Sequence, residues 1–221
     1  MSTRIVLAAL LLLSGAAHAD EVFSHPQTAT QLLQGALLQP AMALREAQVV
    51  RGNFIFRKHL QEIPQPIVSR GSFVFVKGLG IDWHTREPFD SDFVLTATGM
   101  KQIDDGKTTL QMQASAQLAV GVVAKIFLSL LSLDVESLQS SFALFGMQQG
   151  KQWQVGLRPS VPAIAAVFRD AVVSGVTQVD MLLLHDANND QTEISFVDVQ
   201  YSTRSSATDR QLFQYANQQA K

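Results

Sequence analysis

The chain has 221 residues, of which 47% are hydrophobic and 16% are charged, and its net charge is −2. This apolar composition is enough for a large hydrophobic core and excludes a disordered protein. The slightly negative net charge gives no support for nucleic-acid binding. The chain has no cysteine, which excludes disulfide bonds and a lipid attached to an N-terminal thiol.

The N-terminus has the three parts of a secretory signal peptide. Arg4 supplies the positive charge, Ile5–Leu13 is a short apolar stretch, and residues 17–19 (Ala-His-Ala) form a small-x-small cleavage site. We therefore expect cleavage after Ala19 and a single exported domain over residues 20–221. An uncleaved membrane anchor is the alternative, but the apolar stretch is short for a membrane span.

Two helices are expected before the first strand. Thr28–Gln39 has leucines at helical spacing, with Thr28 or Thr30 as its N-cap. Pro40 is expected to end this helix, and a shorter helical pattern follows over Ala41–Ala47.

Alternation with a period of two then predicts β-strands, each with one face rich in phenylalanine. The chain has thirteen phenylalanines against two tyrosines and two tryptophans, and phenylalanine favours dry surroundings. Asp104–Lys107 is a hairpin-turn signal. The expected strands are Gly52–Leu60, Gly71–Lys77, Gly80–Thr85, Asp92–Gly99 and Thr108–Gln113. The large residues on their apolar faces include Phe54, Phe56, Phe73, Phe75, Trp83, Phe93 and Leu95.

Ala119–Leu133 is apolar enough to suggest a membrane span. Lys125, Ser129 and Ser132 interrupt it, however, and strand patterns continue on both sides, so a crossing would divide one sheet between two compartments. We expect a helix that is apolar on more faces than one sheet can cover. Its residues Val123, Phe127 and Leu130 are then expected to cover an apolar pocket.

The remaining elements predict a return to strands. Asp134 starts a short helix. Strands are expected at Phe142–Met147, Trp153–Pro159, Val176–Asp186 and Gln191–Tyr201, with helices at Val161–Asp170 and Ser205–Gln219. Strands joined by short turns are antiparallel. The order therefore predicts a mainly β or α+β fold, with a curved antiparallel sheet and helices on one face.

The polar residues form no recognisable catalytic or metal motif. Asp186, Asn188 and Asp190 begin like a calcium loop, but Gln191 stands where glycine is needed and Val197 where a bidentate glutamate is needed. A polar hairpin turn is the better interpretation.

The histidines and nucleophiles give no better signal. His25, His59, His84 and His185 share no metal-binding spacing, and there is no G-x-S-x-G motif. The paired carboxylates at 104–105 lie in a turn, where they are solvated. We therefore expect no catalysis, no cofactor and no metal, and an exported hydrolase is the alternative.

The phenylalanine-rich faces allow two interpretations. Apolar faces usually pack against each other to form a core. Here the rings are spread over many consecutive strands, so a curved sheet presents a broad concave apolar surface. Such a surface suits an acyl chain or another lipid.

The stretch Phe54–Gly99 resembles the LolA-type outer-membrane lipoprotein carriers, in particular their divergent LolA-like relatives. The matching motifs are an F-x-F-x-K/R strand, PQPIVSRGSFVF (Pro64–Phe75) and GLGIDWHTREPF (Gly78–Phe89). Downstream, SLLSLDVESLQSSFAL, WQVGLRP and the late hairpin VDMLLLHDANNDQTEISFVDV follow in the same order. The resemblance covers roughly Thr28 to Tyr201.

This resemblance implies an incomplete, open antiparallel β-barrel with an α-helical lid over a hydrophobic cavity. It also implies a monomeric periplasmic carrier that takes acylated lipoproteins from an inner-membrane transporter and passes them to an outer-membrane receptor. Lys77 falls where the family has a basic residue that latches the lid, although the family's residue is arginine. A carrier of another acylated amphiphile, such as a glycolipid or a lipid-linked product, and a structural partner of an envelope complex are the alternatives.

Overall fold

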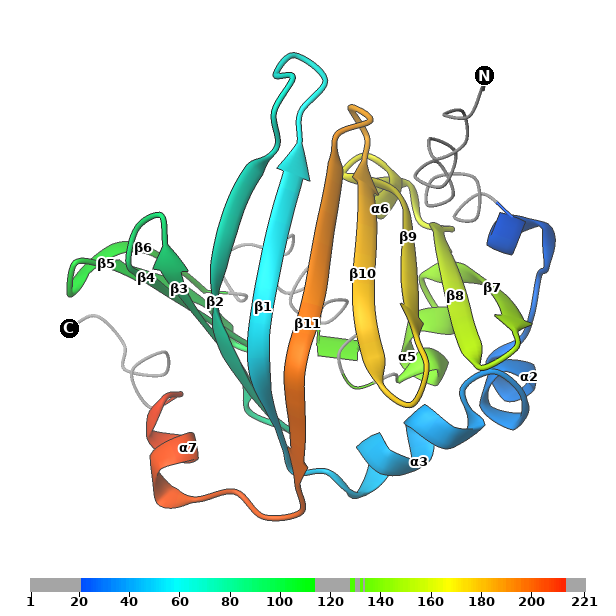
Figure 1. Ribbon diagram of the computed structural model, residues 1–221, viewed down its shortest axis with the longest axis horizontal. Coiled ribbons are helices and arrows are strands. Elements are labelled where there is room, and N and C mark those ends of the chain that lie inside the picture. The colour runs from blue at the N-terminus through cyan, green and yellow to red at the C-terminus, as the bar shows by residue number, and fades with distance from the viewer. Residues whose placement is uncertain (1–20, 114–127, 130–131, 133, 214–221) are drawn as a thin grey trace, which may run out of the picture.

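The computed structural model describes residues 21–113, 128–129, 132 and 134–213 (Figure 1). These residues form one antiparallel sheet of 11 strands, in the order β6-β5-β4-β3-β2-β1-β11-β10-β9-β8-β7. The strands are β1 Val49–His59, β2 Ile67–Val76, β3 Gly80–Glu87, β4 Ser91–Thr96, β5 Gly99–Asp104, β6 Lys107–Gln113, β7 Phe142–Gln149, β8 Gln152–Pro159, β9 Phe168–Gly175, β10 Val179–Asp186 and β11 Gln191–Ser202. The helices are η1 Val22–Ser24, α2 Ala29–Gln34, α3 Leu38–Glu46, α5 Val135–Gln139, α6 Pro162–Ala165 and α7 Ala207–Gln211.

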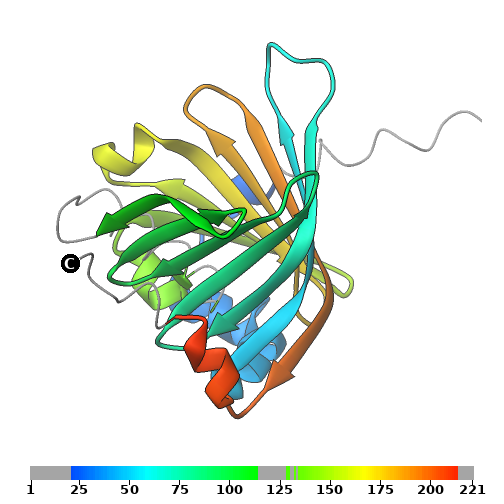
Figure 2. The ribbon, with the colours of Figure 1, turned by 90° about the vertical axis from the view of Figure 1, so that its left-hand side faces the viewer.

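The sheet curves strongly but does not close, because β6 and β7 remain as its two edges. Figure 2 shows α3 and α5 inside the curve. One buried cluster joins the inner face of the sheet to α2, α3 and α5, with Leu32, Leu44 and Leu138 among its members. The expected fold class, an open antiparallel barrel with helices at its mouth, is confirmed. None of the helices described is long and apolar enough to cross a membrane.

The first helical stretch is divided differently from the prediction. Thr28 caps α2 as expected: its Oγ1 accepts from the backbone N–H of Gln31, whose side chain accepts from Thr28 N. The helix ends at Gly35 rather than at Pro40. Pro40 lies in the first turn of α3, where a missing backbone N–H costs no intrahelical bond.

Two other boundaries were predicted wrongly. The helix that starts at Pro162 ends at Ala165, and Phe168–Gly175 is a strand paired with both β8 and β10. The expected strand Asp92–Gly99 ends earlier than predicted: β4 stops at Thr96, the chain turns at residues 97–98, and β5 begins at Gly99. The hairpin turn after β5 is confirmed, with Asp105 and Gly106 both at positive φ, 50° and 73°.

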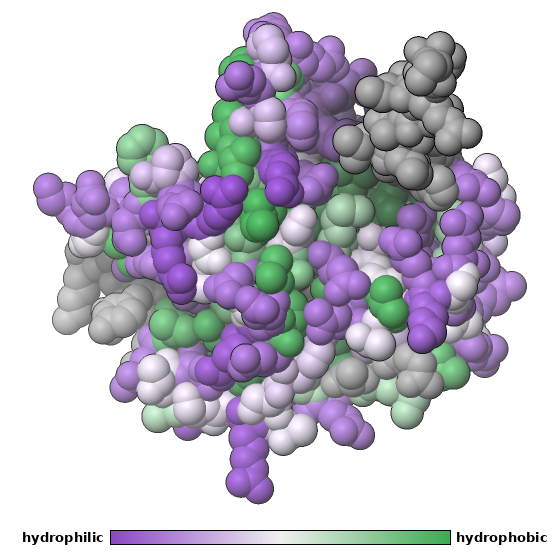
Figure 3. All heavy atoms as spheres, viewed as in Figure 1, coloured by the Kyte–Doolittle hydropathy of each residue, from purple (hydrophilic) through white to green (hydrophobic). Residues whose placement is uncertain are grey.

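Helical segments also pack on the outer face of the sheet, which corrects the expectation that all helices lie on one face. Near the N-terminus, Val22 is fully buried with Phe145 and Val172. The ring of Phe23 meets Phe145 edge-on at 5.3 Å, and the Arg158 guanidinium lies 4.6 Å from the Phe23 ring centroid. The face seen in Figure 3 is mostly hydrophilic, with small groups of hydrophobic residues between the hydrophilic ones.

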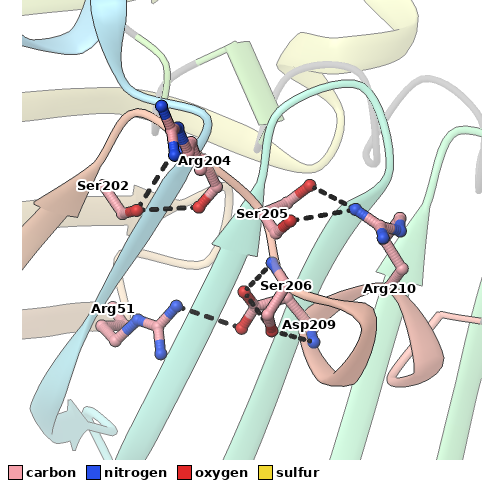
Figure 4. A network of polar contacts seen from close by, with 7 residues as sticks. All are labelled: Arg51, Ser202, Arg204, Ser205, Ser206, Asp209 and Arg210. Carbon is pink, nitrogen blue, oxygen red and sulfur yellow. Dashed lines mark hydrogen bonds and ion pairs between the residues drawn. The ribbon is translucent and has the colours of Figure 1, made fainter.

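At the other end of the described chain, α7 packs on the outer face of β1, β2 and β4. Phe213 is buried there among Val49, Val76 and Val94. Asp209 anchors the helix: its carboxylate accepts from Ser206 and pairs with Arg51 at 3.0 Å (Figure 4). The expected helix over Ser205–Gln219 is confirmed only for α7, since its end lies outside the described residues.

Candidate functional site

Two cross-strand pairs between β1 and β2 position the rings of Phe54 and Phe73 on the inner face of the sheet. Phe54 lies opposite Gly71, and Phe73 lies opposite Gly52. A Cβ atom on Gly71 would come within 2.8 Å of the Phe54 ring, and one on Gly52 within 3.1 Å of the Phe73 ring. Each ring therefore reaches over the backbone of the neighbouring strand, into space that the Cβ of any other residue would crowd.

The rings meet in one cluster at the middle of the inner face. Trp83 stacks on Phe54 with centroids 3.8 Å apart and on Phe73 at 6.2 Å. Phe196 of β11 meets both Phe73 and Trp83 edge-on, at 5.3 and 6.4 Å. Phe196 was missing from the predicted set, although its alternation with Ile194 in the β11 pattern could have identified it. We call Phe54, Phe73, Trp83 and Phe196 the ring cluster.

A cavity of about 690 Å³ lies beside the ring cluster, between helices α2, α3 and α5, the β2–β3 turn and the β4–β5 turn. Its apolar wall consists of Leu33, Ala41, Leu44, Ala47, Val50, Phe75, Leu79, Ala97, Leu128 and Val135. Its polar side chains are Lys77, Ser129, Ser132, Asp134, Glu136 and Ser137. The cavity is thus amphipathic, and its polar groups come from the β2–β3 turn and residues 129–137.

Several of these polar side chains are held by local hydrogen bonds. Asp134 caps α5 by accepting from the backbone N–H of Ser137 at 3.1 Å and from its hydroxyl at 2.6 Å. The hydroxyl of Ser132 donates to the carbonyl of Leu128 at 2.8 Å. The backbone N–H of Lys77 donates to the carbonyl of Gln48, which ties the β2–β3 turn to the segment after α3.

A second, much smaller void of about 20 Å³ adjoins the cavity. The two share Leu44, Val50 and Phe75 as lining residues. The rest of its wall is Phe73, Val179, Phe196, Val199 and Tyr201. Burial, with a smaller effect from Asp180, raises the pKa of the Tyr201 hydroxyl to about 12, so this hydroxyl is uncharged at neutral pH.

The structure separates the predicted site residues into three groups. Phe75 and Lys77 line the cavity. Phe54, Phe73 and Leu95 are buried in the core beside it, and the half-buried Phe56, Trp83 and Phe93 pack against that core. The predicted covering residues Val123, Phe127 and Leu130 lie outside the described residues. Most of the residues that line the cavity, including Leu33, Leu44 and Val135 of the helices, were thus not singled out by the sequence analysis.

The histidines of the described segments, and the acidic side chains that pair with them, do not line this cavity. His84 and its partners Asp90 and Asp92 lie on the outer face, since His84 alternates with the inward-facing Trp83. His185 pairs with Asp170 on another part of the sheet. Within residues 21–113 and 134–213, no three acidic or histidine side chains are placed to hold a metal ion.

The hairpin that resembles a calcium loop is closed by its own hydrogen bonds. One carboxylate oxygen of Asp186 accepts from the backbone N–H groups of Asn188 and Asp190, at 2.8 and 3.0 Å. The side chain of Asp190 accepts from the backbone N–H of Gln61 in the neighbouring β1–β2 hairpin. These contacts are those of a polar turn.

No protein-family model and no curated protein matches the chain. Among solved structures, a LolA superfamily protein from Nitrosomonas europaea is 9% identical, with 79% of this chain and 97% of that chain covered at a TM-score of 0.41. LprF from Mycobacterium bovis is 12% identical, with 82% and 98% covered at 0.37. MucB in its complex with MucA from Pseudomonas aeruginosa is 10% identical, with 80% and 58% covered at 0.42. These likenesses extend only to the general course of the chain, so the fold assignment rests on the strand order and curvature described above.

Proposed function

We propose that this protein is an exported carrier without catalytic activity, which binds the acyl chains of a lipoprotein in the cavity beside α3. The observation that carries the proposal is the amphipathic cavity of about 690 Å³ within an open half-barrel. Its volume is within the range of about 300–1,000 Å³ that is usual for small-molecule sites. Its apolar wall suits a hydrocarbon chain, and its serines and charged side chains suit the polar end of an amphiphile.

The energy of such binding is sufficient for a carrier. Each buried methylene contributes about 0.8 kcal/mol, so ten methylenes contribute about 8 kcal/mol before the costs of ordering the chain. A carrier of this kind shields the bound acyl chain from water while the cargo crosses an aqueous compartment. The signal-like N-terminus supports a periplasmic location. By the sequence resemblance, the donor is an inner-membrane transporter and the acceptor is an outer-membrane receptor.

The test is lipid binding by the mature chain, measured by native mass spectrometry and by uptake of a fluorescent fatty acid. Leu44→Trp fills the cavity from α3, where Leu44 is 6% exposed. Met42→Trp is the matched control, because Met42 lies on the same helix but is 56% exposed. We expect Leu44→Trp to weaken uptake at least tenfold and Met42→Trp to leave it unchanged. A wild-type chain that carries and takes up no lipid contradicts the proposal.

Lys77 is proposed to stabilise the closed cavity by electrostatic attraction to the segment that carries Asp134 and Glu136, which line the same cavity. Lys77→Met should then speed the release of a bound fatty acid. Lys151→Met removes an exposed lysine from the β7–β8 turn and serves as the control. Equal release rates for the two variants contradict the proposed role of Lys77 in closing the cavity.

A second candidate is a carrier of a different amphiphile, such as a glycolipid. The six polar side chains of the cavity favour it, since they provide hydrogen bonds for a head group. Mass spectrometry of lipids that co-purify with the wild-type protein distinguishes the two candidates. An acylated peptide supports the lipoprotein carrier, and a glycolipid without peptide supports the second candidate.

A further inference from the structure

The small void beside the ring cluster continues the large cavity inward. Leu44, Val50 and Phe75 line both spaces, so a chain that enters the cavity and passes these residues reaches the void. The void holds about 20 Å³, and a single water needs about 10–15 Å³ of the same kind of space. It therefore has room for about one methyl or methylene group, which suits the end of one hydrocarbon chain but not of two.

Phe73 and Phe196 are the two rings of the ring cluster in the wall of this void, which Val179, Val199 and Tyr201 complete. Their rings meet edge-on at 5.3 Å, and the two side chains are 3% and 7% exposed. Phe73 cannot move back, because its ring already lies over the backbone of Gly52. Phe196 also contacts Trp83, which is itself stacked on Phe54. The wall is thus supported by the whole ring cluster.

We propose that Phe196 and Phe73 set the longest acyl chain that this protein binds, with one chain per protein passing Phe75 toward the ring cluster. The inference rests on the proposed function, since it concerns the depth of the same site. Its physical basis is that each methylene adds binding energy only while it enters apolar space. A methylene that meets a ring which cannot move aside adds no binding energy. It forces the acyl chain to bend back.

The experiment measures binding of the straight-chain saturated fatty acids from octanoate to stearate by calorimetry, with the full mature chain. For the wild type, affinity should rise about fourfold per methylene up to a limiting length and then stop rising. Phe196→Ala removes one of the two rings from the wall and should move this limit to longer chains. Val199→Phe adds a ring to the void and should move the limit to shorter chains.

Phe89→Ala is the matched control, because Phe89 is 80% exposed in the β3–β4 turn and should leave the limit unchanged. Circular dichroism establishes which variants fold, and Val199→Phe tests the same wall if Phe196→Ala does not fold. A limit that neither variant moves overturns the inference and leaves the carrier proposal standing. If the wild type binds no member of the series, both proposals fail together.

Discussion

Phe54 stacks on Trp83 across an intervening strand, with ring centroids 3.8 Å apart and planes inclined by 26°. Phe54 belongs to β1 and Trp83 to β3, and β2 runs between them. The contact is possible because the β2 residue opposite Phe54 is Gly71, which has no side chain to separate the rings. A single glycine thus determines how the ring cluster is built.

Gly71→Ala should therefore be strongly destabilising. The new Cβ would lie 1.9 Å from the carbonyl oxygen of His84 and 2.8 Å from the Phe54 ring, and the His84 backbone cannot move without breaking the β2–β3 pairing. We expect a loss of about 3 kcal/mol in the free energy of unfolding, measured by urea denaturation. Gly106→Ala is the control, since nothing crowds its Cβ and only its positive φ opposes alanine, at a cost of about 1 kcal/mol. Equal losses in the two variants contradict this account of Gly71.

The strands could be predicted wherever one face is buried and the other is not. The inward residues Phe54, Phe73 and Trp83 alternate with more polar ones, and the structure places all three on the inner face. β9 was missed because both of its faces are covered: Ala171 faces the core, whereas Val172 packs against Val22. A continuous apolar run of this kind does not distinguish a strand from a buried helix.

The cavity itself could not be predicted from alternation. The predicted rings fill the middle of the barrel with each other, so the remaining space lies beside them, against the small side chains Ala41 and Ala47 of the α3 region. Small residues at one helix face are equally compatible with close packing.

The position of α7 could not be predicted either. The residues it packs near, Val49 and Val94, precede it by more than a hundred residues in the chain.

Asp82 should make the protein more stable in mild acid than at neutral pH. Burial, reinforced by the nearby Asp92 and opposed by His84, raises the pKa of Asp82 from 3.8 to about 6. The folded state therefore binds this proton more tightly than the unfolded state, and stability falls as pH rises from about 4 to about 6. The shift corresponds to about 3 kcal/mol at most, and solvent screening of this partly exposed group reduces it to about 1 kcal/mol.

Asp82→Asn should then raise the unfolding temperature above pH 6 and change it little below about pH 4. Asp90→Asn is the control, because Asp90 lies 3.6 Å from the same histidine but its side chain is 65% exposed. Thermal unfolding at a series of pH values measures both variants. If Asp82→Asn is destabilising at neutral pH, the Asp82 carboxylate stabilises the fold as a partner of His84. The predicted fall in stability with rising pH is then wrong.

Asp209 should have the opposite pH dependence. Burial alone raises its pKa, but the hydrogen bonds from Ser206 and the ion pair with Arg51 outweigh burial and lower the pKa below its usual value. Its stabilising contribution is therefore complete above the unfolded pKa of about 3.9 and is lost as pH falls through the lower folded pKa.

Asp209→Asn should cost about 2 kcal/mol at neutral pH, because it removes the charge from several hydrogen bonds at a site only 6% exposed. The cost should shrink as the pH is lowered below about 4. Urea denaturation over this pH range tests both points. Asp198→Asn is the control, since Asp198 accepts from Asn53 on the exposed surface. A cost for Asp209→Asn that does not change with pH contradicts the proposed role of the carboxylate charge.

The N-terminal segment should protect the edge strand β7 from pairing with other chains. Gln27 N donates to the carbonyl of Leu144, and the N–H of Gly146 donates to the carbonyl of His25, so the segment occupies hydrogen-bonding groups of that edge. Val22 holds the segment down, being fully buried against the outer face. An unprotected edge strand is a template for association.

Val22→Asp should release this segment, because a carboxylate in that pocket would be buried without a partner. We expect faster hydrogen exchange at Gly146 and a larger species in light scattering that grows with protein concentration. Ser24→Asp places the same charge at an exposed position of the same turn and should have neither effect. A monomeric Val22→Asp variant with unchanged exchange at Gly146 would show that β7 is protected by contacts other than those of Val22.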